Sequence, residues 1–132
     1  IERAEGVSVR EIFERDGEAR FRELEAAALV DVGSNDPSVI SCGGGVVRGP
    51  ANRVTLLAAG GVVFRSVPLG VLLARVRPGA ERPLIRTEGD LEKLFVDREP
   101  LYREFAAHVV DASGSAEDVA AAIEKELLRW SA

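Results

Sequence analysis

The sequence alternates short apolar runs with longer segments of helical periodicity, and this alternation restricts the possible folds more than any other feature. Residues 39–41, 62–64 and 108–110 are short runs that predict buried strands. Strands that alternate with crossover helices form parallel sheets, so we expect an α/β domain with a parallel sheet flanked by helices. Three short strands make a thin sheet for so much helix. This thinness indicates that strands of the complete fold lie outside the sequence.

Helical spacing of apolar residues predicts the segments between and around these strands. They are residues 7–13, 20–30, 52–59, 69–76, 91–106 and 116–130. Ser8 and Glu11 have the spacing of a capping box and are expected to begin the first helix. Residues 16–18, Asp-Gly-Glu, predict a turn before the second helix. Residues 77–89 are rich in Arg, Pro and Gly, which predicts an exposed, mobile loop.

Length and charge limit the class of protein. With 132 residues the chain is long enough for one compact domain. Its net charge of -5 argues against a general nucleic-acid surface, which carries clustered positive charge. No apolar run approaches the roughly 20 residues that cross a bilayer. The single cysteine, Cys42, can form no internal disulfide and is expected to be a small core residue. These features predict a cytoplasmic protein with no membrane or nucleic-acid partner.

Four groups of residues follow one another along the chain. They are D-G-E-x-x-F-R-x-x-E at 16–25, S-C-G-G-G at 41–45, R-P-L at 82–84 and R-x-P-L-Y at 98–102. Each group alone is weak, but in this order and at these separations they resemble the shikimate kinase family. The resemblance extends over essentially the whole of residues 1–132.

This resemblance implies a fold and a reaction. The fold is a P-loop, nucleoside-monophosphate-kinase-like parallel sheet flanked by helices, with its first two strands and first helix missing from this chain. The reaction transfers the ATP γ-phosphate to the 3-hydroxyl of shikimate, giving shikimate 3-phosphate for chorismate and aromatic amino acid biosynthesis. Shikimate, ATP and Mg²⁺ are the implied ligands. Residues 8–30 would form the shikimate-binding helices and residues 77–89 the lid of a monomer, or of one domain in a larger polypeptide.

Two arginines are the implied carboxylate ligands. By the resemblance, Arg22 and Arg98 would hold the shikimate carboxylate, and a planar guanidinium suits this role because it donates two parallel hydrogen bonds. Glu25 lies one turn after Arg22 on the same helix face. It would hold that arginine or accept a hydrogen bond from a ring hydroxyl. The alternative for Arg22 and Glu25 is an ordinary surface ion pair.

The triple glycine is expected to contact the substrate ring. Gly43, Gly44 and Gly45 follow a predicted strand, where ligands of parallel α/β sheets usually bind. Three residues without side chains allow close approach of the backbone and its N–H groups. The alternative is a flexible connection between strand and helix. Phe13 and Phe21 match positions that wall the pocket in the family, and their alternative is ordinary core packing.

The resemblance assigns the nucleotide side of the reaction to three residues. Arg82, in the lid, would be the catalytic residue, since phosphoryl transfer needs positive charge where negative charge builds. Arg75 matches the position that stacks near the adenine. Ser115 is the remaining nucleotide-binding candidate, in the small and neutral turn 113–116, where family members often place an arginine. The alternative for these arginines is a solvated loop.

The phosphate loop of the family is absent from this sequence. Its lysine follows a glycine-rich turn, whereas Lys93 and Lys125 are the only lysines here and neither has such a neighbour. The Asp-x-Asp stretch that serves Mg²⁺ would precede Ile1, so this chain is expected to hold no metal ligands. The missing strand would lie between the strands at 39–41 and 62–66. We therefore expect residues 1–132 alone to bind ATP poorly, to be inactive and to fold weakly, and a complementing N-terminal segment to restore folding and activity.

Two other functions are compatible with the same residues. One is a non-catalytic shikimate kinase-like domain of a larger or regulatory protein, which would bind a small cyclic acid without chemistry. The other is a related small-molecule kinase such as a gluconate kinase. Arg22, Arg98 and the triple glycine favour a cyclic carboxylic acid over gluconate.

Overall fold

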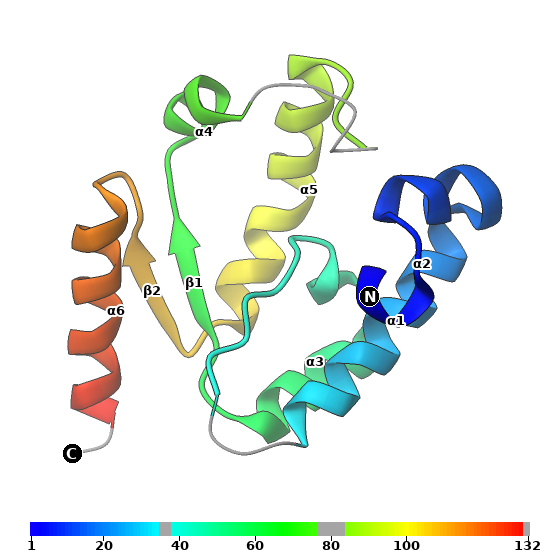
Figure 1. Ribbon diagram of the computed structural model, residues 1–132. Helices are drawn as coiled ribbons and strands as arrows, with labels where there is room; N and C mark the ends of the chain where they lie inside the picture. Colours follow the sequence, from blue (N-terminus) through cyan, green and yellow to red (C-terminus); the bar gives the residue numbers. More distant parts are fainter. Residues whose placement is uncertain (35–37, 77–83, 131–132) are drawn as a thin grey trace.

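The protein folds as a set of helices around a short parallel sheet. The computed structural model describes residues 1–34, 38–76 and 84–130, and the backbone is shown in Figure 1. In chain order its elements are α1 (Glu2–Glu5), α2 (Val9–Gly33), η1 (Val46–Arg48), α3 (Pro50–Ala59), β1 (Val63–Ser66), α4 (Leu69–Arg75), α5 (Glu88–Phe105), β2 (His108–Asp111) and α6 (Ala116–Trp130).

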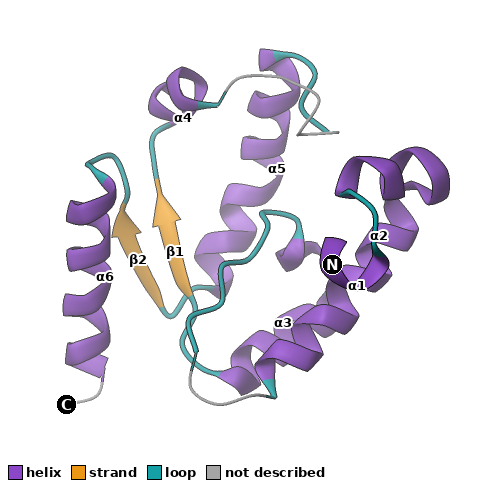
Figure 2. Ribbon diagram, in the orientation of Figure 1, coloured by secondary structure: helices purple, strands orange, loops and turns teal. Residues whose placement is uncertain are grey.

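The sheet of the described residues has two parallel strands, β1 and β2. Val63 pairs with His108 and Ser66 with Asp111 at the two ends of the ladder. The crossover between the strands contains α4 and α5, as expected for parallel pairing. Figure 2 shows α6 beside β2 and α5 on the other side of the strand pair. The predicted strands at 62–64 and 108–110, and the predicted α/β class, are therefore confirmed.

The predicted strand at 39–41 is wrong for the residues that the structure describes. Residues 38–43 are extended but carry no strand assignment, and Val39 is 96% exposed. A strand requires a hydrogen-bonded neighbour, and no described element pairs with this segment. The apolar run is present in the sequence, but the ladder that would bury it is not formed by these residues.

The two helices predicted at 7–13 and 20–30 are two arms of α2. The arms meet at Gly17, whose φ of 81° and ψ of 175° are not helical. This left-handed φ is accessible to glycine because it has no Cβ, so the predicted turn at 16–18 is confirmed as a kink. The capping box at the start of α2 is also confirmed. The Glu11 carboxylate accepts from the Ser8 N–H at 2.9 Å, and the Glu11 N–H donates to the Ser8 hydroxyl at 3.2 Å.

The largest described cluster of the hydrophobic core joins α2, η1, α3 and α5. Its buried members are Leu29, Val46, Val47, Leu56 and Phe105. Val46 and Val47 follow the triple glycine directly, so this core fixes the glycine turn from its C-terminal side. No helix in the described part of the chain is long and apolar enough to span a membrane.

Candidate functional site

Three charged side chains and a tyrosine surround the turn formed by residues 43–45. A Cβ atom built on Gly45 would lie 2.4 Å from Arg22 Nη1, and one on Gly43 would lie 3.3 Å from Glu25 Oε1. Real Cβ contacts under 3.0 Å are essentially never seen, so the Arg22 guanidinium occupies space that only a glycine leaves free. The alternative of a merely flexible connection does not account for this close approach.

The other side of the same turn is covered by α5. A Cβ atom on Gly44 would lie 2.8 Å from Tyr102 Oη and 3.5 Å from Arg98 Nη1. The Tyr102 hydroxyl donates a hydrogen bond to the Gly44 carbonyl. Arg22 and Arg98, which are 76 positions apart in the sequence, therefore converge on one glycine turn from α2 and α5. The predicted assembly of the two arginines with the triple glycine is present.

Arg22 is held by two carboxylates of its own helix. Its Nη1 donates to Glu25 Oε2 at 2.7 Å, and its Nε and Nη2 donate to Glu18 Oε1 at 3.3 and 3.2 Å. Its guanidinium also lies 5.0 Å from the centre of the Phe21 ring. The Glu25 side chain is only 11% exposed, so this pair is more buried than an ordinary surface ion pair.

Arg98, unlike Arg22, is not paired with a carboxylate among the described residues. It is 9% exposed, and its Nε and Nη2 atoms are buried without a hydrogen-bond acceptor among the described residues. These two N–H groups point in the same direction and form the side-on edge of the guanidinium, which matches the two oxygens of a carboxylate. A buried cation without a partner is costly. This edge is therefore the strongest indication of an anionic ligand in the described part of the molecule.

The two phenylalanines pack against each other. The Phe13 and Phe21 rings lie on opposite arms of α2, with centroids 4.8 Å apart and planes tilted by 41°. The kink at Gly17 brings the two arms together, so a glycine in the middle of the segment explains the contact. Each side chain is half-buried. Mutual packing is present, and their predicted role as a pocket wall remains a prediction.

Arg75 and Ser115 lie at the turn that follows β2. The Arg75 guanidinium donates to the carbonyl oxygens of Ala112 at 2.7 Å, Ser113, and Gly114 at 3.1 Å. The Ser115 hydroxyl accepts from the Asp118 N–H at 3.2 Å and so caps α6. Arg75 thus ties the end of α4 to the turn that carries Ser115. Contact of either residue with a nucleotide remains a prediction.

The proposed lid is described only in part. Arg82 lies outside the described residues. Glu88 and Gly89 belong to the first turn of α5, which Thr87 and Asp90 begin with a capping box, so the predicted loop boundary at 89 is wrong. Ile85 is 8% exposed and therefore not part of an exposed loop. Thr87 and Asp90 follow a segment with little apolar periodicity, so the start of α5 at this capping box was not predicted.

Glu18 and Tyr102 contact the site, although neither was among the predicted site residues. Glu18 precedes Arg22 by four residues and Tyr102 follows Arg98 by four, so each lies on the helix face of its arginine. This spacing is the signal by which both residues could have been found. It cannot show that Tyr102 reaches Gly44, because 58 positions separate the two residues.

Cys42 is exposed, so its prediction as a core residue is wrong. Ile40 of the same segment packs against the core cluster, whereas Cys42 does not belong to that cluster. Partial burial of the thiol, and then the charge of Glu25, raise the pKa of Cys42. A raised pKa disfavours the thiolate, and the residue is therefore a poor nucleophile at neutral pH.

The described residues do not form a magnesium site. Within residues 1–34, 38–76 and 84–130 there is no group of three His, Cys, Asp or Glu side chains that could hold a metal ion.

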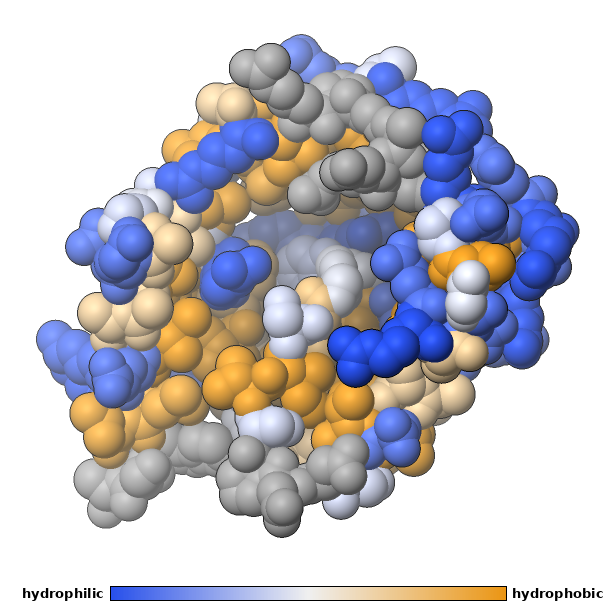
Figure 3. All heavy atoms as spheres, in the orientation of Figure 1, coloured by the Kyte–Doolittle hydropathy of each residue, from blue (hydrophilic) through white to orange (hydrophobic). Residues whose placement is uncertain are grey.

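One cavity of about 370 Å³ lies away from the glycine turn, between α5 and the ends of β1 and β2. Its lining includes Ser66, Phe95, Glu99, Arg103 and Asp111. None of the candidate residues borders it. Figure 3 shows that this face of the molecule is hollowed near its centre, beside a hydrophilic surface on the side of α1 and α2. The glycine turn is a better candidate than the cavity because only the turn combines buried, unpaired donors with convergent charges.

The fold and the glycine turn define a class: parallel α/β domains, whose ligands usually bind near the ends of the strands, here with buried N–H donors that lack an acceptor among the described residues. The sequence model of the family "Shikimate kinase" matches residues 1–128. The chain belongs to the shikimate kinase family, and both the predicted resemblance and the predicted fold are confirmed.

Relatives and solved structures agree with this assignment. A shikimate kinase from Halorhodospira halophila is 44% identical over 117 residues, which cover 86% of this chain and 66% of the relative. One from Aromatoleum aromaticum is 44% identical over 114 residues, covering 84% and 65%. The structure of the shikimate kinase from Acinetobacter baumannii in complex with shikimate has a TM-score of 0.91 and 33% identity, covering 97% of this chain and 74% of that one. The chain spans about two thirds of the length of the curated relatives it matches.

Proposed function

We propose that this chain carries the shikimate-binding part of a shikimate kinase, which transfers the ATP γ-phosphate to the 3-hydroxyl of shikimate. The observation that carries the proposal is the side-on edge of Arg98, buried beside the glycine turn with two N–H donors and no acceptor among the described residues. A carboxylate would supply two oxygens to this edge. Membership of the family, and the likeness to a relative described in complex with shikimate, support shikimate as the acid.

The residues around the turn divide the work of binding. Arg98 would donate the bidentate pair, and Arg22, fixed by Glu18 and Glu25, would add a second positive charge beside it. Glu25 lies next to Gly43 and would accept a hydrogen bond from a ring hydroxyl. The carboxylate and one hydroxyl of the substrate would thus be bound from different sides of the turn.

The glycine turn would offer its N–H groups to the ligand. Its carbonyl oxygens are engaged by the protein: Gly43 O accepts from Val46 N and Gly45 O accepts from Arg48 N, each at 3.1 Å, while Gly44 O accepts from Tyr102. Binding through the carbonyls fixes the orientation of the peptide planes. The N–H groups of the turn donate to no acceptor among the described residues, so they could contact an oxygen-rich ring.

The phosphoryl-transfer side of the reaction rests on fewer observations. Arg82 would neutralise charge on the transferring phosphate, and Arg75 with Ser115 would border the adenine. ATP would need a phosphate loop, which the sequence does not contain, so we expect residues 1–132 alone to bind ATP poorly, to be inactive and to fold weakly. We further propose that the enzyme is cytoplasmic and acts as a monomer or as a domain of a larger polypeptide.

Calorimetry and a coupled kinase assay test the proposal on the protein with its natural flanking sequence. Arg22→Ala and Arg98→Ala should each weaken shikimate binding by at least tenfold, whereas Arg20→Ala, two positions from Arg22 and exposed, should not. Turnover with shikimate and ATP is expected only when a phosphate loop is present. Binding without turnover in the presence of that loop would favour the non-catalytic alternative. Unchanged affinity in both arginine variants would contradict the site itself.

A further inference from the structure

The geometry points to Tyr102 as a positioning residue for Arg98. We infer that the Tyr102 hydroxyl links the glycine turn to the Arg98 guanidinium. In the free protein the side-on edge of Arg98 would then already face the position that the carboxylate of the substrate will occupy. The inference rests on the proposed function, because it concerns the same carboxylate site. It adds a residue that touches neither the proposed substrate nor the nucleotide.

The position of Tyr102 is fixed on two sides. Its hydroxyl donates to the Gly44 carbonyl, and its ring packs on Phe64 of β1 with centroids 5.1 Å apart and planes tilted by 35°. A Cβ atom on Gly44 would lie 2.8 Å from Tyr102 Oη and 3.5 Å from Arg98 Nη1. The phenol oxygen therefore lies close to both the glycine turn and the Arg98 guanidinium.

The protonation of Tyr102 suits this role. Burial is the main influence and raises its pKa, while the charge of Arg98, a hydrogen bond with Arg98 and the charge of Arg22 act in the opposite direction. The phenol is therefore neutral at physiological pH. A neutral phenol donates one hydrogen bond, here to Gly44, and its oxygen can still accept one from a neighbouring donor such as Arg98.

Holding one nitrogen of a planar group orients the rest of it. Arg98 Nη1 lies on the Tyr102 side, while Nε and Nη2 are the two atoms without an acceptor. An arginine side chain loses considerable rotamer freedom when it is fixed. If that freedom is already lost in the free protein, less is lost when the carboxylate binds, and affinity rises.

The competing explanation is that Tyr102 only fills space against Phe64. The two explanations differ in what the hydroxyl does. A space-filling tyrosine can be replaced by phenylalanine without loss of carboxylate recognition, whereas a positioning tyrosine cannot.

The test uses Tyr102→Phe in the protein with its natural flanking sequence. Calorimetry measures the dissociation constants of shikimate and of shikimate methyl ester, in which the carboxylate charge is removed. We expect Tyr102→Phe to weaken shikimate about tenfold, as for loss of one hydrogen bond of about 1.4 kcal/mol. The ester and the KM for ATP should change less than twofold. Phe64→Leu, which trims the ring contact and keeps the hydroxyl, is the matched control and should preserve the ratio of the two dissociation constants.

A second measurement follows the pKa of Tyr102 in the wild-type protein, so it does not depend on the stability of a variant. Shikimate would neutralise the Arg98 charge, so the pKa of Tyr102, followed by phenolate absorbance against Tyr102→Phe as the blank, should rise when shikimate is added. An unchanged acid-to-ester ratio in Tyr102→Phe, or no shift of the pKa with shikimate, would overturn the Tyr102 inference while wild-type binding still stands. Wild-type protein that binds neither compound would overturn the proposed function and the inference together.

Discussion

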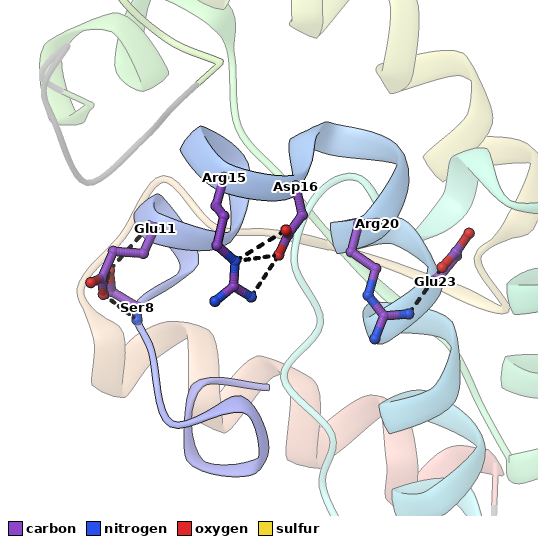
Figure 4. A network of polar contacts seen from close by, with 6 residues as sticks. All are labelled: Ser8, Glu11, Arg15, Asp16, Arg20 and Glu23. Atoms are coloured by element: carbon purple, nitrogen blue, oxygen red, sulfur yellow. Dashed lines mark hydrogen bonds and ion pairs between the residues drawn. The ribbon is translucent and has the colours of Figure 1, made fainter.

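Arginines on the outer face of α2 and at the glycine turn lie in opposite environments. Along α2, Arg15 pairs with Asp16 at 2.7 Å and Arg20 pairs with Glu23 at 3.0 Å, as Figure 4 shows. The Arg15 and Arg20 side chains are 61% and 47% exposed, so water solvates both guanidinium groups. At the turn, Arg98 is buried and two of its nitrogens have no acceptor among the described residues.

This difference in burial and pairing indicates which of the charged residues are candidates for ligand binding. Exposed ion pairs of the α2 kind contribute about 0–1 kcal/mol each and need no ligand to explain them. A buried, unpaired guanidinium opposes folding, so its presence requires another reason. Arg22 lies between the two extremes, because it is one-quarter exposed and already paired with acids. Removing a charge should therefore cost binding at the turn and cost almost nothing on the outer face of α2.

Replacing Arg98 should have the largest effect on binding and little effect on folding. We expect Arg98→Met to weaken shikimate binding by about 100-fold, since a charge-assisted bidentate pair would be lost. The free energy of unfolding without ligand should not fall, because an apolar chain replaces an unpaired buried cation. Calorimetry and urea denaturation measure the two quantities. Arg20→Met is the control, and a large stability loss in Arg98→Met would contradict the contrast.

A methyl group at Gly45 should act on binding through Arg22. The added Cβ of Gly45→Ala would lie 2.4 Å from the Arg22 guanidinium, which is the flexible end of its side chain and would move away. We expect about tenfold weaker shikimate binding, or about 1.4 kcal/mol. Gly70→Ala in α4, whose Cβ meets nothing within 4 Å, should leave binding unchanged. Equal affinities in the two variants would show that Arg22 is not held by the turn.

The capping box of α5 should make stability depend on pH. Hydrogen bonds from the Thr87 and Arg86 N–H groups, and then from the Thr87 hydroxyl, lower the pKa of Asp90 below its usual 3.8. The folded-state pKa is thus lower than the unfolded one, so this stabilisation is complete above the usual value and is lost as pH falls through the folded value. Urea denaturation should separate Asp90→Asn from wild type at pH 7 and bring them together in strong acid.

The capping box of α5 can be tested against a control residue in the first turn of the same helix. Thr87→Ala should cost about 1 kcal/mol, as for other helix N-caps. Glu88→Gln changes an exposed acid in the first turn and should cost less. A difference between Asp90→Asn and wild type that grows in acid would contradict the assignment.

The smallest effect is expected on the outer face of α2. Glu23→Gln removes the exposed partner of Arg20 and should change the free energy of unfolding by less than about 0.5 kcal/mol. Shikimate affinity should be unchanged. Glu25→Gln, two residues further along and facing Gly43, is the matched comparison and should weaken binding. A larger stability loss in Glu23→Gln would mean that this face is not simply solvated.

Local features of the fold were predictable from sequence, whereas features that need a distant partner were not. The break at Gly17 follows from the Asp-Gly-Glu turn signal, and the cap at Ser8 follows from its spacing to Glu11. The strand predicted at 39–41 failed because a strand exists only with a neighbour, which periodicity does not reveal.

The candidate site shows the same limit. Family resemblance placed Arg22, Arg98 and the triple glycine together, and the structure brings them together. The burial of Arg98 and the bond from Tyr102 to Gly44 could not be foreseen, because both depend on how α5 packs against a turn far away in sequence. Arg82 lies outside the described residues, so its role stays a prediction.

The one-sided pairing of β1 has a practical consequence. Among the described residues β1 has a single neighbour, β2, so its other edge presents unpaired N–H and C=O groups, and an extended segment at 38–43 carries the exposed Val39. Open edges of this kind recruit strands from other molecules. Residues 1–132 prepared in isolation should therefore self-associate as their concentration rises, and a peptide able to add to this edge should keep them monomeric.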